Sequence, residues 1–164
     1  MIRNKRFCKL PERGGFRIPC PCLFLFCAAL ALTVDDTGLL RIGLLCALLH
    51  ECGHIAAYLI FVGRWPVIEV TPLGLCMRMR GIWLSPRQEL MLAAVGPLVN
   101  LSLCSIAILL MDGPFGYSYR GYWFATVNLL VGCTNLLPLP GLDGARILHC
   151  LGEGARSGLH SRRK

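Results

Sequence analysis

Three ionisable residues stand within five positions of a long apolar run: His50, Glu51 and His54, in the stretch "LLHECGHIAAY". Residues four apart share one face of an α-helix, about 6 Å apart along its axis, so both imidazoles can reach one point. Two such histidines beside a glutamate are typical of a zinc site in which the glutamate is the general base. A lone histidine in a membrane span usually forms an interhelical hydrogen bond. Three ionisable groups together favour the metal site, because each is costly in hydrocarbon.

Catalytic zinc needs a third protein ligand. Most other acidic residues fall in expected loops, basic flanks or a helix start, which leaves Glu69 and Asp143 as candidates. Asp143 follows "NLLPLPGL", where Pro138 and Pro140 cannot continue a helix. Interrupted helix at membrane depth is tolerated beside a polar cavity, which favours Asp143 as the ligand. The alternative is a Pro-Gly turn at the membrane surface, capped by Asp143.

A further polar element is the stretch "AAVGPLVN". Gly96 permits close approach of helices, Pro97 produces a kink, and Asn100 is an amide that needs a hydrogen-bond partner inside the membrane. The stretch therefore fits either the wall of a polar site or simple packing of small residues with one hydrogen-bonded asparagine.

The composition predicts a single membrane domain. The chain has 164 residues, of which 55% are hydrophobic, and its mean hydropathy is +0.59. Fifteen of the 17 Lys and Arg residues lie in three blocks, at 1–19, 63–87 and 145–164, which separate the apolar runs as cytoplasmic loops do. A nucleic-acid binder can also carry a net charge of +8, but the basic residues form no patch interleaved with aromatics. We therefore expect no nucleic-acid partner.

The apolar runs predict an all-α membrane fold of four spans, at about 18–34, 39–62, 88–111 and 121–137. The first span is short for a bilayer. This topology puts all three basic blocks on one side and both termini in the cytoplasm. Two β-rich segments around "PLG", within residues 64–81, predict a small β-hairpin at the cytoplasmic surface, with an irregular loop as the alternative. Residues 1–152 form the expected core, and residues 153–164 a basic, disordered tail.

The three motifs occur in one order: HExxH with Gly in its fourth position, GPxxN one span later, and NxxPxPxxDG after the next span. This pattern, over about residues 39–150, resembles the site-2 protease family of intramembrane zinc metalloproteases, and most of all its bacterial stage IV sporulation protein FB branch. The resemblance implies one Zn²⁺ per chain, held by His50, His54 and Asp143. It implies roles for further residues: Glu51 as general base and acid, Asn135 near the scissile carbonyl, and Gly96, Pro97, Asn100, Pro138 and Pro140 in the wall of the site.

The implied reaction is hydrolysis of a peptide bond within or near a transmembrane segment, as in regulated intramembrane proteolysis. It implies a membrane-tethered protein substrate, a bilayer, a membrane regulatory protein as a further partner, and the membrane of a bacterial cell or inner spore membrane as the location. The hairpin at 66–80 could offer an edge strand to an unwound substrate. Two other functions stay open: a membrane metal carrier or sensor, and an inactive scaffold that binds substrates. Neither needs Glu51.

Overall fold

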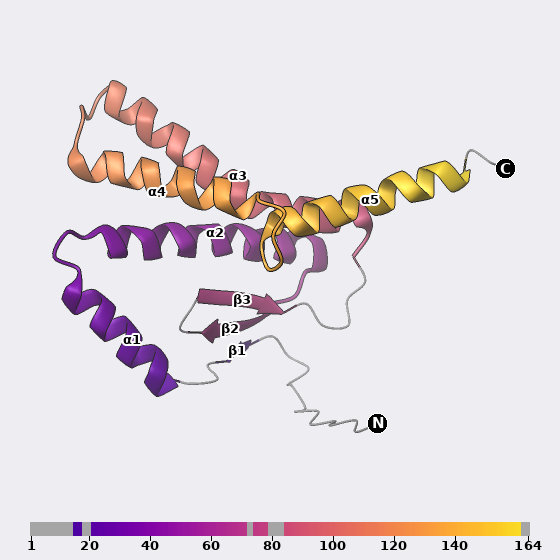
Figure 1. Cartoon of the computed structure of the whole chain (residues 1–164), viewed down its shortest axis with the longest axis horizontal. Coiled ribbons are helices and arrows are strands. Elements are labelled where there is room, and N and C mark those ends of the chain that lie inside the picture. Colours follow the sequence, from indigo (N-terminus) through magenta and orange to yellow (C-terminus); the bar gives the residue numbers. More distant parts are fainter. Residues whose placement is uncertain (1–14, 18–20, 72–73, 79–83, 162–164) are drawn as a thin grey trace.

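The computed structural model describes residues 15–17, 21–71, 74–78 and 84–161, and helices dominate this part of the chain (Figure 1). The helices are α1 (Pro21–Val34), α2 (Leu39–Val62), α3 (Pro86–Asp112), α4 (Tyr119–Asn135) and α5 (Asp143–Ser161). The strands are β1 (Gly15–Arg17), β2 (Val67–Thr71) and β3 (Gly74–Arg78).

Helix α2 has the bounds that its apolar run predicts, because a glycine flanks each end. Gly38 and Gly63 have φ angles of 75° and 69°, which favour glycine. Because these angles are not those of an α-helix, the helix begins after Gly38 and ends before Gly63. The Gly63 N–H donates to the carbonyl of Leu59 at 2.8 Å, which closes the last turn.

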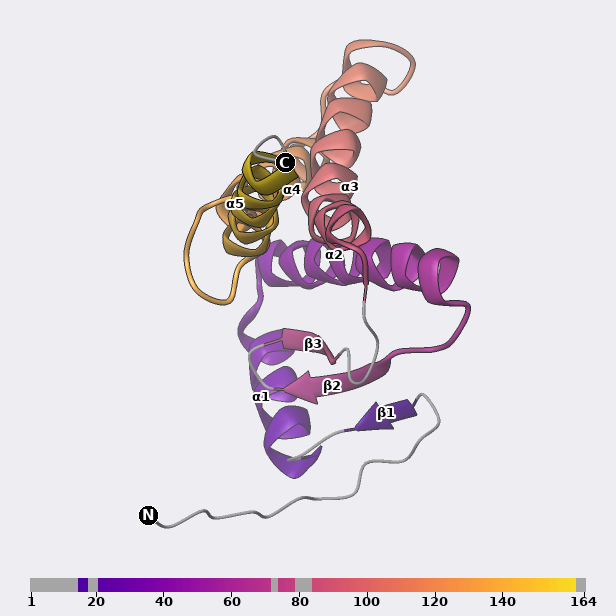
Figure 2. The same cartoon turned by 90° about the vertical axis from the view of Figure 1, so that its right-hand side faces the viewer.

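Helix α3 begins at a capping box and forms the centre of the helical bundle. The Ser85 Oγ accepts from the Gln88 N–H, and the Gln88 side chain accepts from the Ser85 N–H. Pro97 lies inside the helix. Helix α3 crosses α2 and also packs against α4 and α5, so it links all the elements that carry candidate site residues (Figure 2).

The three strands form one sheet in the order β1-β2-β3, below α2 in the view of Figure 1. Strands β2 and β3 pair antiparallel, from Val67 opposite Arg78 to Thr71 opposite Gly74. Strand β1 pairs parallel to β2 and was not predicted. Strand β3 contacts α2, so the sheet is attached to the helix that carries both candidate histidines.

Two helices, α2 and α3, are long and apolar enough to cross a membrane by length and composition, among the residues described. Helices α1 and α4, with 14 and 17 residues, overlap the other two expected spans and are shorter than α2 and α3. Large apolar side chains such as Phe26, Ile60, Leu109 and Leu130 are exposed on four helices. Such extensive apolar surface is expected where lipid replaces water.

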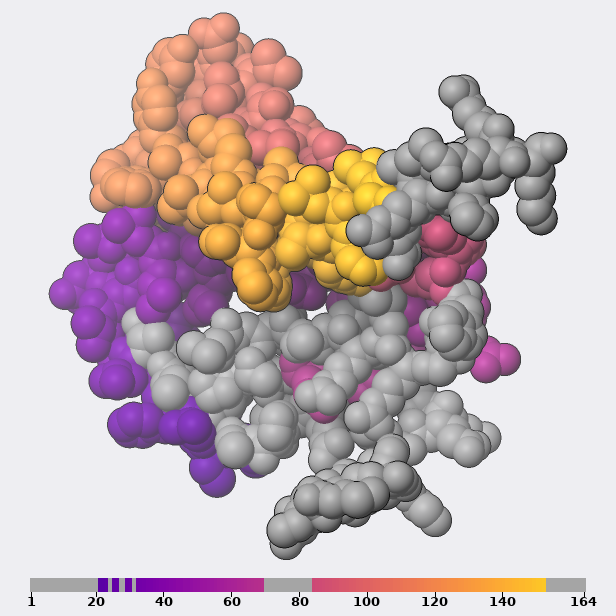
Figure 3. Space-filling view, turned by 45° about the vertical axis from the view of Figure 1, so that its right-hand side comes forward, coloured from indigo at the N-terminus to yellow at the C-terminus, as the bar shows by residue number. Residues whose placement is uncertain are grey.

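The expected boundary between the core and the basic tail, at residue 152, lies within helix α5. Helix α5 continues to Ser161, and only residues 162–164 lie outside the described part. No proline follows Pro140, so nothing in the sequence forces the helix to stop early. In the space-filling view, α4 and the start of α5 form a continuous ridge above α2 (Figure 3).

Candidate metal centre

The two histidines of α2 are buried where α2 meets α3. His50 and His54 are each 5% exposed. Gly53, between them in sequence, lets the helices approach closely, because a Cβ at this position would lie 2.9 Å from the Val99 Cγ2 atom. The close approach shields both imidazoles from lipid.

Asp143 reaches the same place through a compact turn between α4 and α5. It is the first residue of α5 and is 8% exposed. Gly141 has a φ of 93°, and a Cβ on Gly144 would collide with the carbonyl group of Leu136. Because Gly144 has no side chain, the first turn of α5 packs directly on the backbone after α4 and directs Asp143 toward α2. Asp143 therefore does not cap a surface turn.

Three ligand atoms meet in a nearly equilateral triangle. The Nε2 atoms of His50 and His54 are 3.1 Å apart, and each lies 3.1 Å from Oδ2 of Asp143. Ligands of a tetrahedral zinc ion, each about 2.0–2.1 Å from the metal, are about 3.3–3.4 Å apart. A proton satisfies one pair of these atoms, whereas a divalent cation satisfies all three. The arrangement therefore fits zinc with a fourth position open, as in catalytic sites.

The tautomer of His54 also fits a metal ligand. Its Nδ1 atom lies 2.8 Å from the backbone oxygen of Leu92 on α3. A carbonyl oxygen can only accept, so Nδ1 carries the proton and Nε2 keeps its lone pair for the triangle. Metal-binding histidines are commonly oriented by such a second hydrogen bond.

Gly96 on α3 leaves the space beside both imidazoles open. A Cβ at this position would lie 2.7 Å from the His50 Nε2 atom and 2.6 Å from the His54 Cε1 atom, and would collide with the His54 Nε2 atom. Pro97 is fully buried next to it. Asn100, one turn further, is also fully buried, and its Nδ2 lies 3.5 Å from the carbonyl oxygen of Cys46. The "GPLVN" stretch therefore packs against the histidine face of α2.

The second oxygen of Asp143 faces a cation that the sequence analysis did not identify. Its Oδ1 atom lies 3.8 Å from a guanidinium nitrogen of Arg146, one turn along α5. The Asp143 carboxylate thus turns Oδ2 to the two histidines and Oδ1 to Arg146. In the sequence, the spacing of three positions between the aspartate and this basic residue could have indicated the contact.

Glu51 and Asn135 lie outside the triangle. Glu51 is half-buried and makes no hydrogen bond within the described part of the chain. Asn135, the last residue of α4, is also half-buried, and its Nδ2 donates to the Val131 carbonyl at 2.9 Å rather than to the triangle. Pro138 and Pro140 lie in the exposed segment that follows.

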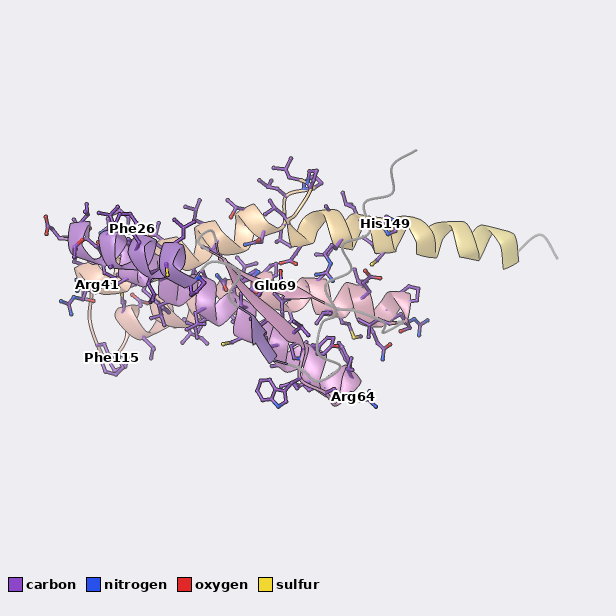
Figure 4. The ribbon with its side chains drawn as sticks, turned by 90° about the horizontal axis from the view of Figure 1, so that it is seen from below. Phe26, Arg41, Arg64, Glu69, Phe115 and His149 are labelled. Atoms are coloured by element: carbon purple, nitrogen blue, oxygen red, sulfur yellow. The ribbon has the colours of Figure 1, made fainter. Side chains whose placement is uncertain are left out.

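Glu69 was the alternative third ligand. It lies on β2, is 8% exposed, and is not part of the His50, His54 and Asp143 group. Among the described residues, these three form the His, Cys, Asp and Glu group whose atoms are close enough to hold one ion. Figure 4 shows Glu69 on the sheet.

Asn128 on α4 is a buried polar residue that the sequence analysis missed. It is fully buried, and its Nδ2 donates to the carbonyl of Phe124 at 2.8 Å and to the sulfur of Cys46 at 3.1 Å. In the sequence, it could have been noticed only as a single amide residue within the fourth apolar run.

The chain is similar in sequence to known peptidases. Residues 114–164 match the model of peptidase family M50. Stage IV sporulation protein FB of Bacillus subtilis is 30% identical over 125 residues, which cover 76% of this chain and 43% of that protein. "Putative zinc metalloprotease Rip3" of Mycobacterium tuberculosis is 33% identical over 113 residues, which cover 62% of this chain and 27% of that protein. The chain thus spans less than half the length of these curated relatives.

The fold has a counterpart among solved structures. The site-2 protease of Methanocaldococcus jannaschii superposes with a TM-score of 0.58 over 87% of this chain and 69% of that chain, at 24% identity. The sequence and family matches confirm the predicted resemblance to the site-2 protease family. The sporulation protein is among the relatives, as the motif pattern predicted.

Proposed function

We propose that this chain is an intramembrane zinc metalloprotease that hydrolyses a peptide bond within or near a transmembrane segment of a membrane-tethered protein. The observation that carries the proposal is the buried triangle of His50 and His54 on α2 and Asp143 on α5. One Zn²⁺ per chain fits these three ligands, and Gly96 keeps the neighbouring space open. The protease and metalloprotease names of the matched families and relatives support the same reaction.

The roles of this chain's residues follow from their chemistry. Zinc, when bound, would supply a Lewis acid that polarises the scissile carbonyl and activates water at neutral pH. The Glu51 carboxylate, next to a ligand and free of recorded hydrogen bonds, would take a proton from the attacking water and give it to the leaving amine nitrogen. The Asn135 amide would turn from the Val131 carbonyl to donate to the oxyanion.

The sheet is the proposed receptor for the unwound substrate. A helical substrate keeps its scissile bond inside its own hydrogen-bonded ladder, so the segment must become extended before cleavage. Strand β3 pairs with β2 on one side and contacts α2, the helix of the histidines. An extended chain added to the edge of β3 that faces no other described strand would gain backbone hydrogen bonds beside α2.

We propose that the chain lies in the membrane of a bacterial cell or spore with both termini in the cytoplasm. Three basic blocks and the lengths of α2 and α3 support this arrangement. Arg41 and Phe115 lie toward one end of the bundle, and Arg64 toward the other (Figure 4). In this arrangement the Arg64 end faces the cytoplasm. A membrane regulatory protein is a proposed further partner.

Co-expression with candidate single-span membrane proteins tests the function. Wild type should generate fragments of the true substrate, whereas Glu51→Gln should not. Glu89→Gln, an acidic-to-amide change in the first turn of α3, is the matched control and should cleave normally. A metal carrier or an inactive scaffold cleaves nothing and needs no Glu51, so a lack of cleavage by both wild type and Glu51→Gln, with zinc bound to both, would favour those functions.

A further inference from the structure

Three buried side-chain atoms have no hydrogen-bond partner within the described structure: Nδ1 of His50, Oδ1 of Asn100 and Oδ1 of Asn128. They belong to three different helices, α2, α3 and α4. His50 is 5% exposed, and the two asparagines are completely buried. Buried polar atoms are almost always paired, because an unpaired one loses its hydration without compensation. These three atoms therefore call for a common explanation.

The three side chains meet around Cys46. The Nδ2 of Asn100 lies 3.5 Å from the Cys46 carbonyl oxygen, and the Nδ2 of Asn128 donates to the Cys46 sulfur at 3.1 Å. His50 lies one helical turn after Cys46 on the same face of α2. Cys46 is itself fully buried. The two amides are thus held beside the turn of α2 that carries the His50 imidazole.

The three atoms are one hydrogen-bond donor and two acceptors. His50 presents Nε2 to the metal triangle, so the proton of its neutral ring lies on Nδ1, which becomes a donor. The Nδ2 of Asn128 faces a carbonyl oxygen, which fixes its Oδ1 as an acceptor, and the same reasoning holds for Asn100. One donor cannot satisfy two acceptors directly, and two amide oxygens cannot pair with each other.

We propose that these three polar atoms together bind one buried water molecule. The water accepts from the His50 Nδ1–H and donates its two hydrogens to Oδ1 of Asn100 and Oδ1 of Asn128. Its three hydrogen bonds match what buried waters in proteins typically make. This inference rests on the proposed metal centre, and it makes Asn100 and Asn128 positioning residues for a zinc ligand. His54 needs no such water, because the Leu92 carbonyl orients it.

The test measures the zinc affinity of the 164-residue chain in detergent by competition with a chelator. Asn128→Leu and Asn100→Leu remove the acceptors and should each weaken zinc binding by about 10–100-fold, as losses of second hydrogen bonds to ligands do. The double variant should be much less impaired than the product of the two effects, because both amides hold the same water.

Conservative variants separate positioning from helix packing. Asn128→Asp and Asn100→Asp keep a carbonyl oxygen, and in this buried place the acid is neutral and retains a donor, so zinc affinity should stay within about threefold of wild type. Ser105→Ala and Thr134→Val are controls on α3 and α4, since these exposed hydroxyls bond only to carbonyls of their own helices. Their zinc affinity should not change.

Two results would overturn the water-mediated role. The first is unchanged zinc affinity in folded Asn→Leu variants. The second is a zinc affinity of the folded Asn→Asp variants that is as weak as that of the leucine variants. Where the leucine variants fail to fold, the corresponding result is loss of zinc binding by the folded Asn→Asp variants. If wild type itself binds no zinc, the metal centre fails as well. Zinc binding by wild type that every folded variant matches would remove this inference and leave the proposed protease intact.

Discussion

Gly96 on α3 lies directly against His54 on α2, so close that any Cβ at position 96 would collide with the His54 Nε2 atom. The same Cβ would lie 2.7 Å from Nε2 of His50. The glycine is therefore needed for the space next to the ligand atoms, rather than for its backbone freedom.

Gly96→Ala should reduce bound zinc from about one ion per chain to near zero, because the new methyl group occupies the coordination region. Metal analysis of the purified variant measures this, and circular dichroism confirms that the helices persist. Gly43→Ala is the matched control, since a Cβ there meets nothing within 4 Å. Full zinc content in Gly96→Ala would place the metal elsewhere.

Asp143→Asn should lose most of the bound zinc and activity, because a neutral amide is a poor ligand for the ion. Glu69→Gln should retain zinc, since Glu69 lies outside the triangle. Zinc stoichiometry of the two purified variants decides between them. The reverse outcome would make the sheet, and not α5, the source of the third ligand.

Glu51→Gln should keep zinc and lower the cleavage rate by at least about 10²–10⁴-fold, because the amide has the same shape but cannot accept the proton. Initial rates on one tethered substrate, with zinc content measured in parallel, test this role. A near-normal rate would assign the base to another group.

Gly144→Ala should destabilise the chain by about 1–3 kcal/mol, because its methyl group would press into the Leu136 carbonyl and move Asp143. Thermal unfolding in detergent provides the measurement. Gly152→Ala, also in α5 but with open space around it, should be neutral or stabilising by about 0.5–1 kcal/mol. Equal effects of the two substitutions would contradict the close packing of the α5 start.

Reporter domains fused at Gly116 and after Lys164 should report opposite sides of the membrane, with the C-terminal fusion in the cytoplasm. The distribution of basic residues gives this orientation. The same side for both fusions would mean that the number of crossings between them is even.

The sequence predicted the local features well and the long-range ones only in part. The two histidines of HExxH lie within one helix, so their spacing alone predicts that they share one face. Asp143 needed elimination and the family resemblance, because it meets His50 across 93 residues. Strand β1 was missed because three residues carry no strand pattern, and its pairing with β2 is distant in sequence.

Buried polar residues beyond the motifs were the least predictable. Asn128 looked like an isolated amide in an apolar run, since its partner Cys46 lies 82 residues earlier. Arg146 looked like one more residue of a basic block, although its guanidinium faces Asp143. In both cases the meaning of the residue depends on which helices become neighbours.

The order of the ligands along the chain has a consequence for biosynthesis. A nascent chain that has inserted α2 and α3 already holds both histidines and Gly96, but it lacks the carboxylate that begins α5. Two imidazoles alone hold zinc poorly. The three-residue group is therefore completed only after α4 and the turn behind it have left the ribosome, and the proposed cleavage cannot begin before then.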